Sequence, residues 1–113
     1  MSLLPARDEI PPGTLYMLIL KTLVRAKQLH GYEIASAIQQ LSDDVLLVEE
    51  GSLYPALQRM LIREWVTAEW GVTVGNRRAR YYRLTAAGRR QLQTETSQYT
   101  RVNGAIQKVL QAT

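Results

Sequence analysis

The 113-residue sequence contains no cysteine and only one histidine. Without cysteine the chain can form neither a disulfide nor a thiolate metal site, and cysteine catalysis is excluded. His30 alone cannot build a histidine-based metal site, and at the start of a helix we expect it to hydrogen-bond locally. No nucleophile–base pair stands out elsewhere, so an enzyme is disfavoured and neither a catalytic residue, a metal nor a cofactor is expected.

Long apolar runs are also missing. No stretch reaches the roughly 18 residues needed to cross a bilayer. The N-terminus has no basic region followed by an apolar one, as a signal peptide would. We therefore expect a cytoplasmic protein without a membrane partner. A chain of 113 residues, 46% of them hydrophobic, predicts one domain with a small core.

Positive charge is modest overall but unevenly distributed. The formal net charge is +4. Between residues 77 and 90, however, there is no acidic residue and there are six arginines: Arg77, Arg78, Arg80, Arg83, Arg89 and Arg90. Arginine makes forked contacts with phosphates and with guanine edges. Such a run is either a solvated basic face or a nucleic-acid contact, and its place in the fold decides between the two.

A mobile arm is predicted over residues 1–12, because little in it can be buried. The Pro-Pro-Gly stretch that ends it stops any earlier structure, and Thr14 suits the N-cap of a first helix over 14–26. Apolar residues almost encircle this helix, so it is either central to the core or shared with a second chain. Leu15 and Leu18 are assigned to such a dimer contact.

A later helix, over residues 51–63, has one apolar and one polar face. Apolar residues recur at i, i+4, i+7 and i+8 from Leu53 and line one side. The opposite side carries a hydroxyl, a proline and an arginine: Ser52, Pro55 and Arg59. Pro55 is tolerable if it lies in the first turn, where its missing N–H has no partner. Gly51 permits a tight start to the helix.

The other segments predict a second helix and a wing. They are a helix over 32–41, a short strand or extended linker over 45–48, and two strands over 65–70 and 77–84. A glycine-containing loop joins the last two into a β-hairpin. Alternation places Arg78, Arg80 and Tyr82 on one face of that hairpin. A hairpin that follows three helices is typical of a wing.

Thr85 is predicted to cap a final helix over residues 86–113. Three helices and a hairpin already close a small core, so this helix has little left to cover and is expected to pack on a second subunit. The alternative is that it lies back on its own domain. Its apolar stripe supplies the remaining dimerisation residues: Leu92, Tyr99, Val102, Ile106, Val109 and Leu110.

Three motifs in this order resemble the PadR family of bacterial transcriptional regulators. They are His-Gly-Tyr-Glu-Ile over residues 30–34, Glu-Gly-Ser-Leu-Tyr-Pro-Ala-Leu over 50–57 with Arg59, and Tyr-Tyr-Arg-Leu-Thr-Ala-Ala-Gly over 81–88. The resemblance covers about residues 12–92. It implies a mainly α fold with a small β-hairpin: a winged helix-turn-helix over 13–85, then a C-terminal dimerisation helix over 86–113.

The resemblance also implies a function. It indicates a homodimeric repressor of transcription that binds double-stranded DNA and is often released by a small-molecule effector. Two-fold symmetry then requires an inverted-repeat operator. The alternative is a winged-helix protein-interaction module without specific DNA binding, in which the arginines only solubilise the chain.

Individual residues match the DNA-contacting positions of the family. The helix over 51–63 matches the one that enters the major groove, and the arginine-rich hairpin matches the wing that grips the adjacent backbone or minor groove. If they reach base edges, Gln58 suits adenine and Arg59 suits guanine. The complete predicted DNA-binding set is Tyr32, Gly51, Ser52, Tyr54, Pro55, Gln58, Arg59, Arg77, Arg78 and Arg80.

The sequence departs from the family pattern in two places. A glycine commonly follows the recognition helix, but Glu64 occupies that place here. A left-handed helix stop is less natural without glycine, so a different or strained exit is expected. Some short members bind flat aromatic drugs between tryptophans of the dimer interface. The C-terminal helix here has no tryptophan and only Tyr99, so drug binding by that route is not expected.

Overall fold

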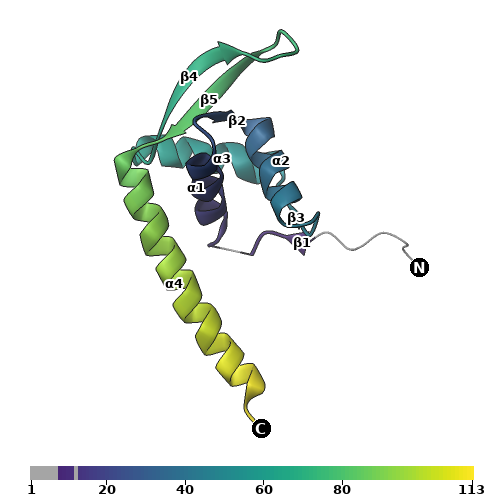
Figure 1. Ribbon diagram of the computed structural model, residues 1–113, viewed down its shortest axis with the longest axis vertical. Helices are drawn as coiled ribbons and strands as arrows, with labels where there is room; N and C mark the ends of the chain where they lie inside the picture. Colours follow the sequence, from purple (N-terminus) through teal and green to yellow (C-terminus); the bar gives the residue numbers. More distant parts are fainter. Residues whose placement is uncertain (1–7, 12) are drawn as a thin grey trace, which may run out of the picture.

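Three helices and a β-hairpin form the body of the protein, and a fourth helix extends from it (Figure 1). The computed structural model describes residues 8–11 and 13–113. Its elements are β1 (Asp8–Glu9), α1 (Leu15–Arg25), β2 (Leu29–His30), α2 (Gly31–Leu41), β3 (Leu46–Leu47), α3 (Glu50–Ile62), β4 (Val66–Val72), β5 (Arg78–Leu84) and α4 (Ala86–Gln111). The fold expected from the sequence, a winged helix-turn-helix with a long C-terminal helix, is confirmed. In the part of the chain described, none of the helices is both long and apolar enough to cross a bilayer.

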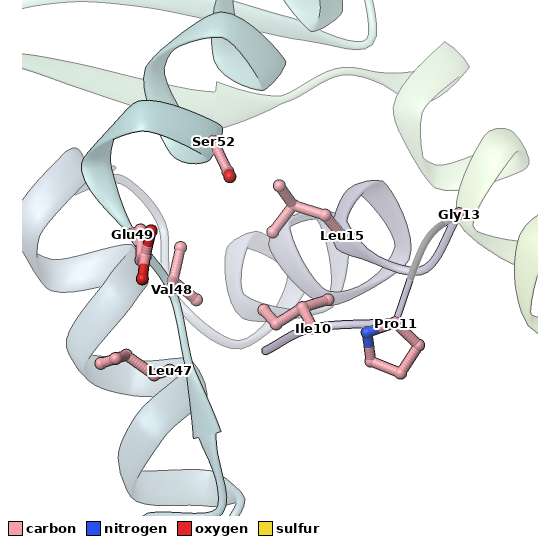
Figure 2. A pocket seen from close by; sticks show the side chains of 8 residues that line it. All are labelled: Ile10, Pro11, Gly13, Leu15, Leu47, Val48, Glu49 and Ser52. Atoms are coloured by element: carbon pink, nitrogen blue, oxygen red, sulfur yellow. The ribbon is translucent and has the colours of Figure 1, made fainter. Parts of the chain in front are cut away.

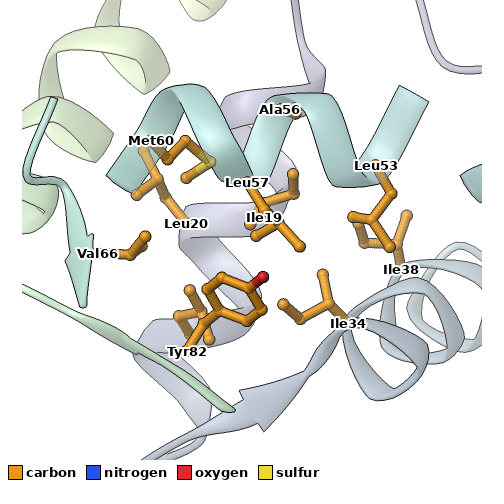
Figure 3. Close-up of a cluster of buried hydrophobic side chains, with 11 residues drawn as sticks. Ile19, Leu20, Ile34, Ile38, Leu53, Ala56, Leu57, Met60, Val66 and Tyr82 are labelled. Atoms are coloured by element: carbon orange, nitrogen blue, oxygen red, sulfur yellow. The ribbon is translucent and has the colours of Figure 1, made fainter. Parts of the chain in front are cut away.

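The core lies where α1, α2, α3 and the hairpin meet. Figure 3 shows one side of α3 pointing at the side chains of the other elements. Leu53, Leu57 and Met60 are buried there as the spacing predicts, Ala56 joins them, and Leu61 is half-buried. Each fully buried aliphatic side chain stabilises the fold by about 1.5–3 kcal/mol. Because the apolar face of α3 packs into the core, its polar face is the one exposed to solvent.

A three-stranded sheet replaces the expected two-stranded hairpin. Its order is β2-β5-β4, and all its pairings are antiparallel. β2 pairs Leu29 with Tyr82 and His30 with Tyr81, in a segment that the sequence indicates only as a break between helices. Two residues are too few to show alternation, which is why the sequence gives no signal for this strand. The pairing ties the start of α2 to the wing.

Part of the predicted mobile arm is paired with the body. β1 forms a parallel pair with β3, Asp8 opposite Leu46 and Glu9 opposite Leu47. Ile10 is half-buried against the core. Within the arm predicted over 1–12, residues 8–11 thus carry a backbone pairing and one half-buried apolar side chain. The rest of that prediction, residues 1–7 and 12, lies outside the described residues. The short strand expected over 45–48 is present as β3.

The start of α3 differs from expectation. The helix begins at Glu50, so Pro55 is its sixth residue and lies in the second turn rather than the first. The N–H that proline lacks would have bonded to the carbonyl of Gly51, so this i→i−4 hydrogen bond is missing from α3. Gly51 is not needed for a tight start either. Its φ is not positive and an added Cβ would meet nothing within 4 Å.

Glu64 ends α3 in the left-handed conformation, with φ 60°. Its N–H donates to the Leu61 carbonyl at 3.0 Å, and the Trp65 N–H donates to the Met60 carbonyl at 3.0 Å. These two bonds are those of a Schellman motif, in which glycine normally occupies the left-handed position. The strained exit predicted from the missing glycine is thus present, because the helix makes the usual stop with a residue that disfavours it.

The end of α3 is joined to the start of α4 through Thr85. Its Oγ1 accepts a hydrogen bond from the Gly88 N–H at 2.9 Å, which confirms the predicted N-cap. The same hydroxyl donates toward two carbonyl oxygens: Oγ1 lies 2.7 Å from that of Glu64 and 3.0 Å from that of Trp65. A Cβ on Gly88 would lie 2.2 Å from the Trp65 oxygen, so only glycine allows this approach. The two helices therefore meet at a close-packed, hydrogen-bonded corner.

Candidate nucleic-acid interface

A groove of about 760 Å³ lies between the wing, the start of α2 and the middle of α3. It is open to solvent and is lined by both helices and both hairpin strands. Six of the residues that the sequence assigns to DNA line it: Tyr32, Tyr54, Gln58, Arg77, Arg78 and Arg80. Segments up to about fifty residues apart in the sequence thus form one surface.

Two tyrosines form the helical side of this groove. Tyr32, in the first turn of α2, is 75% exposed, and Tyr54 of α3 is 48% exposed. A Cβ on Gly31 would lie 2.8 Å from the Tyr54 hydroxyl oxygen, so the absence of a side chain there makes room for Tyr54. The glycine of the His-Gly-Tyr motif therefore sets the position of a residue on the recognition helix.

The buried phenol of Tyr82 forms the floor of the groove. Burial raises the pKa of Tyr82, the positive charge of Arg80 lowers it, and the nearby Tyr54 raises it. The net direction is upward, so this hydroxyl stays neutral around neutral pH. It therefore adds no negative charge that would repel a phosphate.

The wing arginines form the other side of the groove. Arg78 and Arg80 project from β5 toward it, and their guanidinium carbons lie 4.7 and 5.9 Å from the ring centroid of Trp70. Arg77 is exposed beside the hairpin turn, where its N–H donates to Thr73 Oγ1 at 3.2 Å. Trp70 is absent from the predicted site. Its place opposite Arg80 in the hairpin register is the signal that could have identified it.

Arg59 does not line the groove. Its Nε donates to the Tyr16 hydroxyl of α1, and its guanidinium lies 5.8 Å from the centroid of the same ring. The guanidinium that the sequence assigns to guanine is therefore engaged with Tyr16 of α1 rather than with the groove. The reason is a contact between residues 43 positions apart, which no local pattern reveals.

Ser52, Gly51 and Pro55 lie on exposed parts of α3 outside the groove. Figure 2 shows Ser52 beside a smaller pocket of about 250 Å³ between α3, the start of α1 and the segment after β1. Ile10, Leu15, Leu47 and Val48 are among the apolar residues that line that pocket. Of the predicted recognition-helix residues, the structure thus brings only Tyr54 and Gln58 together with the wing.

The predicted dimerisation residues divide into two groups. Leu15, Leu18 and Leu92 are half-buried and pack against the core of their own subunit. Beyond them α4 leaves the body (Figure 1), and its stripe remains 46–78% exposed: Tyr99, Val102, Ile106, Val109 and Leu110. Among the residues that the structure describes, nothing covers this stripe.

Glu95 lies where α4 passes the start of α1, in a pocket of about 230 Å³. Its Oε2 is buried and has no hydrogen-bond partner among the described residues. Burial raises the pKa of Glu95, and the positive charge of Arg63 partly offsets that rise.

His30 makes the local contacts expected from its place at a helix start. Its N–H donates to Glu33 Oε1 at 3.1 Å, and its Nε2 lies 3.4 Å from the same oxygen. Within residues 8–11 and 13–113, there is no cluster of three or more acidic or histidine side chains that could hold a metal ion.

Comparisons with known proteins agree with this geometry. Residues 19–94 match the model of the family described as "Transcriptional regulator PadR-like family". A curated but uncharacterised protein from Lysinibacillus sphaericus is 29% identical over 100 residues, which cover 88% of this chain and 91% of that protein. A solved transcriptional regulator from Clostridium thermocellum is 25% identical, with a TM-score of 0.77, over 85% of this chain and 92% of its own. A PadR family regulator from Eggerthella lenta is 28% identical, with a TM-score of 0.74, over 89% and 85% of the two chains.

Proposed function

The chain belongs to the PadR-like family and is a DNA-binding transcriptional regulator rather than an enzyme, and from this premise we propose that it is a homodimeric repressor of an inverted-repeat operator. One observation carries the proposal. Tyr54 and Gln58 of α3 share a groove with the wing arginines, so base-reading and phosphate-binding groups face the same ligand.

The wing supplies affinity and α3 supplies selectivity. Arg77, Arg78 and Arg80 neutralise phosphates and release counterions, which makes binding strong and salt-dependent. With α3 in the major groove, Gln58 offers the amide that forms two hydrogen bonds with adenine. Arg59 contributes through its contact with Tyr16, which holds α3 against α1.

The exposed stripe of α4 supports the homodimer. Two copies packed through it are related by a two-fold axis, and their α3 helices then enter successive major grooves about 34–36 Å apart. Such a dimer requires an inverted repeat and represses by occupying a promoter. A small-molecule effector releases it by changing how the two α4 helices set that spacing.

The wing assignment is tested by measuring DNA affinity at several salt concentrations. Replacing Arg77, Arg78 and Arg80 by alanine removes up to three phosphate contacts. It is expected to flatten the slope of log affinity against log salt by roughly 2–3. The matched control replaces three exposed arginines of α4, so that it loses the same charge outside the groove: Arg89, Arg90 and Arg101. Equal slopes for the two triple variants would show that net charge, rather than the wing, binds DNA.

The dimer and the operator need separate measurements. Ile106→Glu places a charge in the exposed stripe, and sedimentation is expected to show a monomer with weakened DNA binding. Selection of bound duplexes from a random pool is expected to return an inverted repeat. A pool with no enriched sequence at physiological salt would instead favour the protein-interaction module.

A further inference from the structure

Trp70 lies at the centre of the basic surface of the wing. It is on β4 directly opposite Arg80, while Arg78 lies opposite Val72, two residues along the strand. Side chains alternate along a strand, so Trp70 and both arginines project from the same face of the hairpin, the one that lines the groove. The indole is 58% exposed. Its role is therefore not to fill the core.

Both guanidinium groups lie near the face of the indole. The central guanidinium carbon lies 4.7 Å from the ring centroid in Arg78 and 5.9 Å in Arg80. A cation is attracted to an aromatic face within roughly 6 Å, and among aromatic side chains tryptophan attracts cations most strongly. Within the part of the chain that the structure describes, no carboxylate pairs with either arginine, and Arg80 Nε is buried without a hydrogen-bond partner. Among the described residues, the indole is the group with which both guanidinium groups interact.

We infer that Trp70 is a positioning residue for DNA binding, whose indole holds the guanidinium groups of Arg78 and Arg80 toward the groove before a duplex arrives. The inference rests on the proposed function, since it takes duplex DNA as the ligand. A free arginine side chain loses rotamer freedom when it binds a phosphate, and that loss weakens binding. An aromatic face that already orders two arginines removes part of the loss. It raises affinity without adding a charge.

The test measures binding of the full chain to a fluorescently labelled duplex of mixed sequence at several salt concentrations. Trp70→Ala is expected to weaken binding by ~5–10-fold. The salt slope is expected to stay unchanged, because every charge remains. Trp70→Phe keeps a weaker aromatic face and is expected to retain most of the affinity. Thr67→Ala changes an exposed side chain of the same strand and is expected to bind like the native chain.

A double-mutant cycle separates positioning from direct contact with DNA. In a chain that carries alanine at positions 78 and 80, Trp70→Ala is expected to cause no further loss, because the groups that it positions are gone. A further loss of similar size in that chain overturns the inference, and so does native-like affinity of Trp70→Ala alone. If the native chain binds no duplex, the proposed function fails and the inference with it. If Trp70→Ala unfolds, Trp70→Leu, which is apolar but has no π face, gives the same test.

Discussion

Replacing Glu64 by glycine is expected to stabilise the protein. Glu64 has a φ of 60° and its side chain is exposed, so the substitution removes backbone strain without removing a buried contact. The left-handed conformation costs a residue with a Cβ about 1–2 kcal/mol. Glycine loses about 0.5–1 kcal/mol more conformational freedom on folding. The difference is a net gain of about 0.5–1 kcal/mol in the free energy of unfolding.

Thermal unfolding followed by circular dichroism measures this gain. The midpoint is expected to rise by about 2–5 °C. The protein concentration is held fixed, because the proposed dimer would make unfolding depend on concentration. Glu64→Ala is the matched control, since it removes the carboxylate but keeps the Cβ and therefore the strain. If the glycine variant is no more stable than the alanine variant, the reasoning that places strain at this residue is refuted.

Two further substitutions test the neighbourhood of α4. Gly88→Ala places a Cβ 2.2 Å from the Trp65 carbonyl oxygen and is expected to destabilise the protein by about 3 kcal/mol. The control is Gly104→Ala on the same helix, where a Cβ meets nothing within 4 Å; it should instead stabilise the protein by about 0.5–1 kcal/mol. Chemical denaturation measures both variants, and equal effects would contradict the close approach at Gly88. Because burial raises the pKa of Glu95 above its ordinary value of 4.5, the folded state holds that proton more tightly than the unfolded state. The free energy of unfolding should therefore fall as pH rises through and above 4.5. Denaturation at several pH values should show a shallower fall in Glu95→Gln, and parallel profiles would show that Glu95 does not contribute.

The helices and the wing are predictable because each has enough residues to show its period. α3 carries buried residues at helical spacing from Leu53, and the hairpin strands have seven residues each. The strands β1, β2 and β3 have two residues each. At that length backbone pairing with a distant segment decides the conformation, and no side-chain pattern records it. The helical turn in which Pro55 lies is unpredictable for a related reason, since a helix boundary can move by a residue or two without changing the apolar pattern.

The candidate site is predictable where it depends on a motif and unpredictable where it depends on a long-range contact. Tyr54 and Gln58 follow from the recognition-helix motif, and the structure places both in the groove with the wing arginines. Arg59 does not line the groove because its side chain contacts Tyr16, and this contact joins α1 to α3. The contribution of Trp70 depends on the register of the hairpin, which places it opposite Arg80. The sequence indicates two strands and a loop, but it does not by itself fix which residues pair.

The hydrogen-bonded corner at Thr85 joins α3 to α4, so that the two helices move together. α4 has 26 residues, and at about 1.5 Å per residue it is roughly 39 Å long. If its far end is held in a dimer, a tilt of about 5° moves the corner by roughly 3.4 Å, the rise of one base pair. The hydrogen bonds at the corner pass that displacement directly to the end of α3. In the proposed dimer, a ligand that changes the crossing of the two α4 helices only slightly would therefore be enough to move both α3 helices out of register with the duplex.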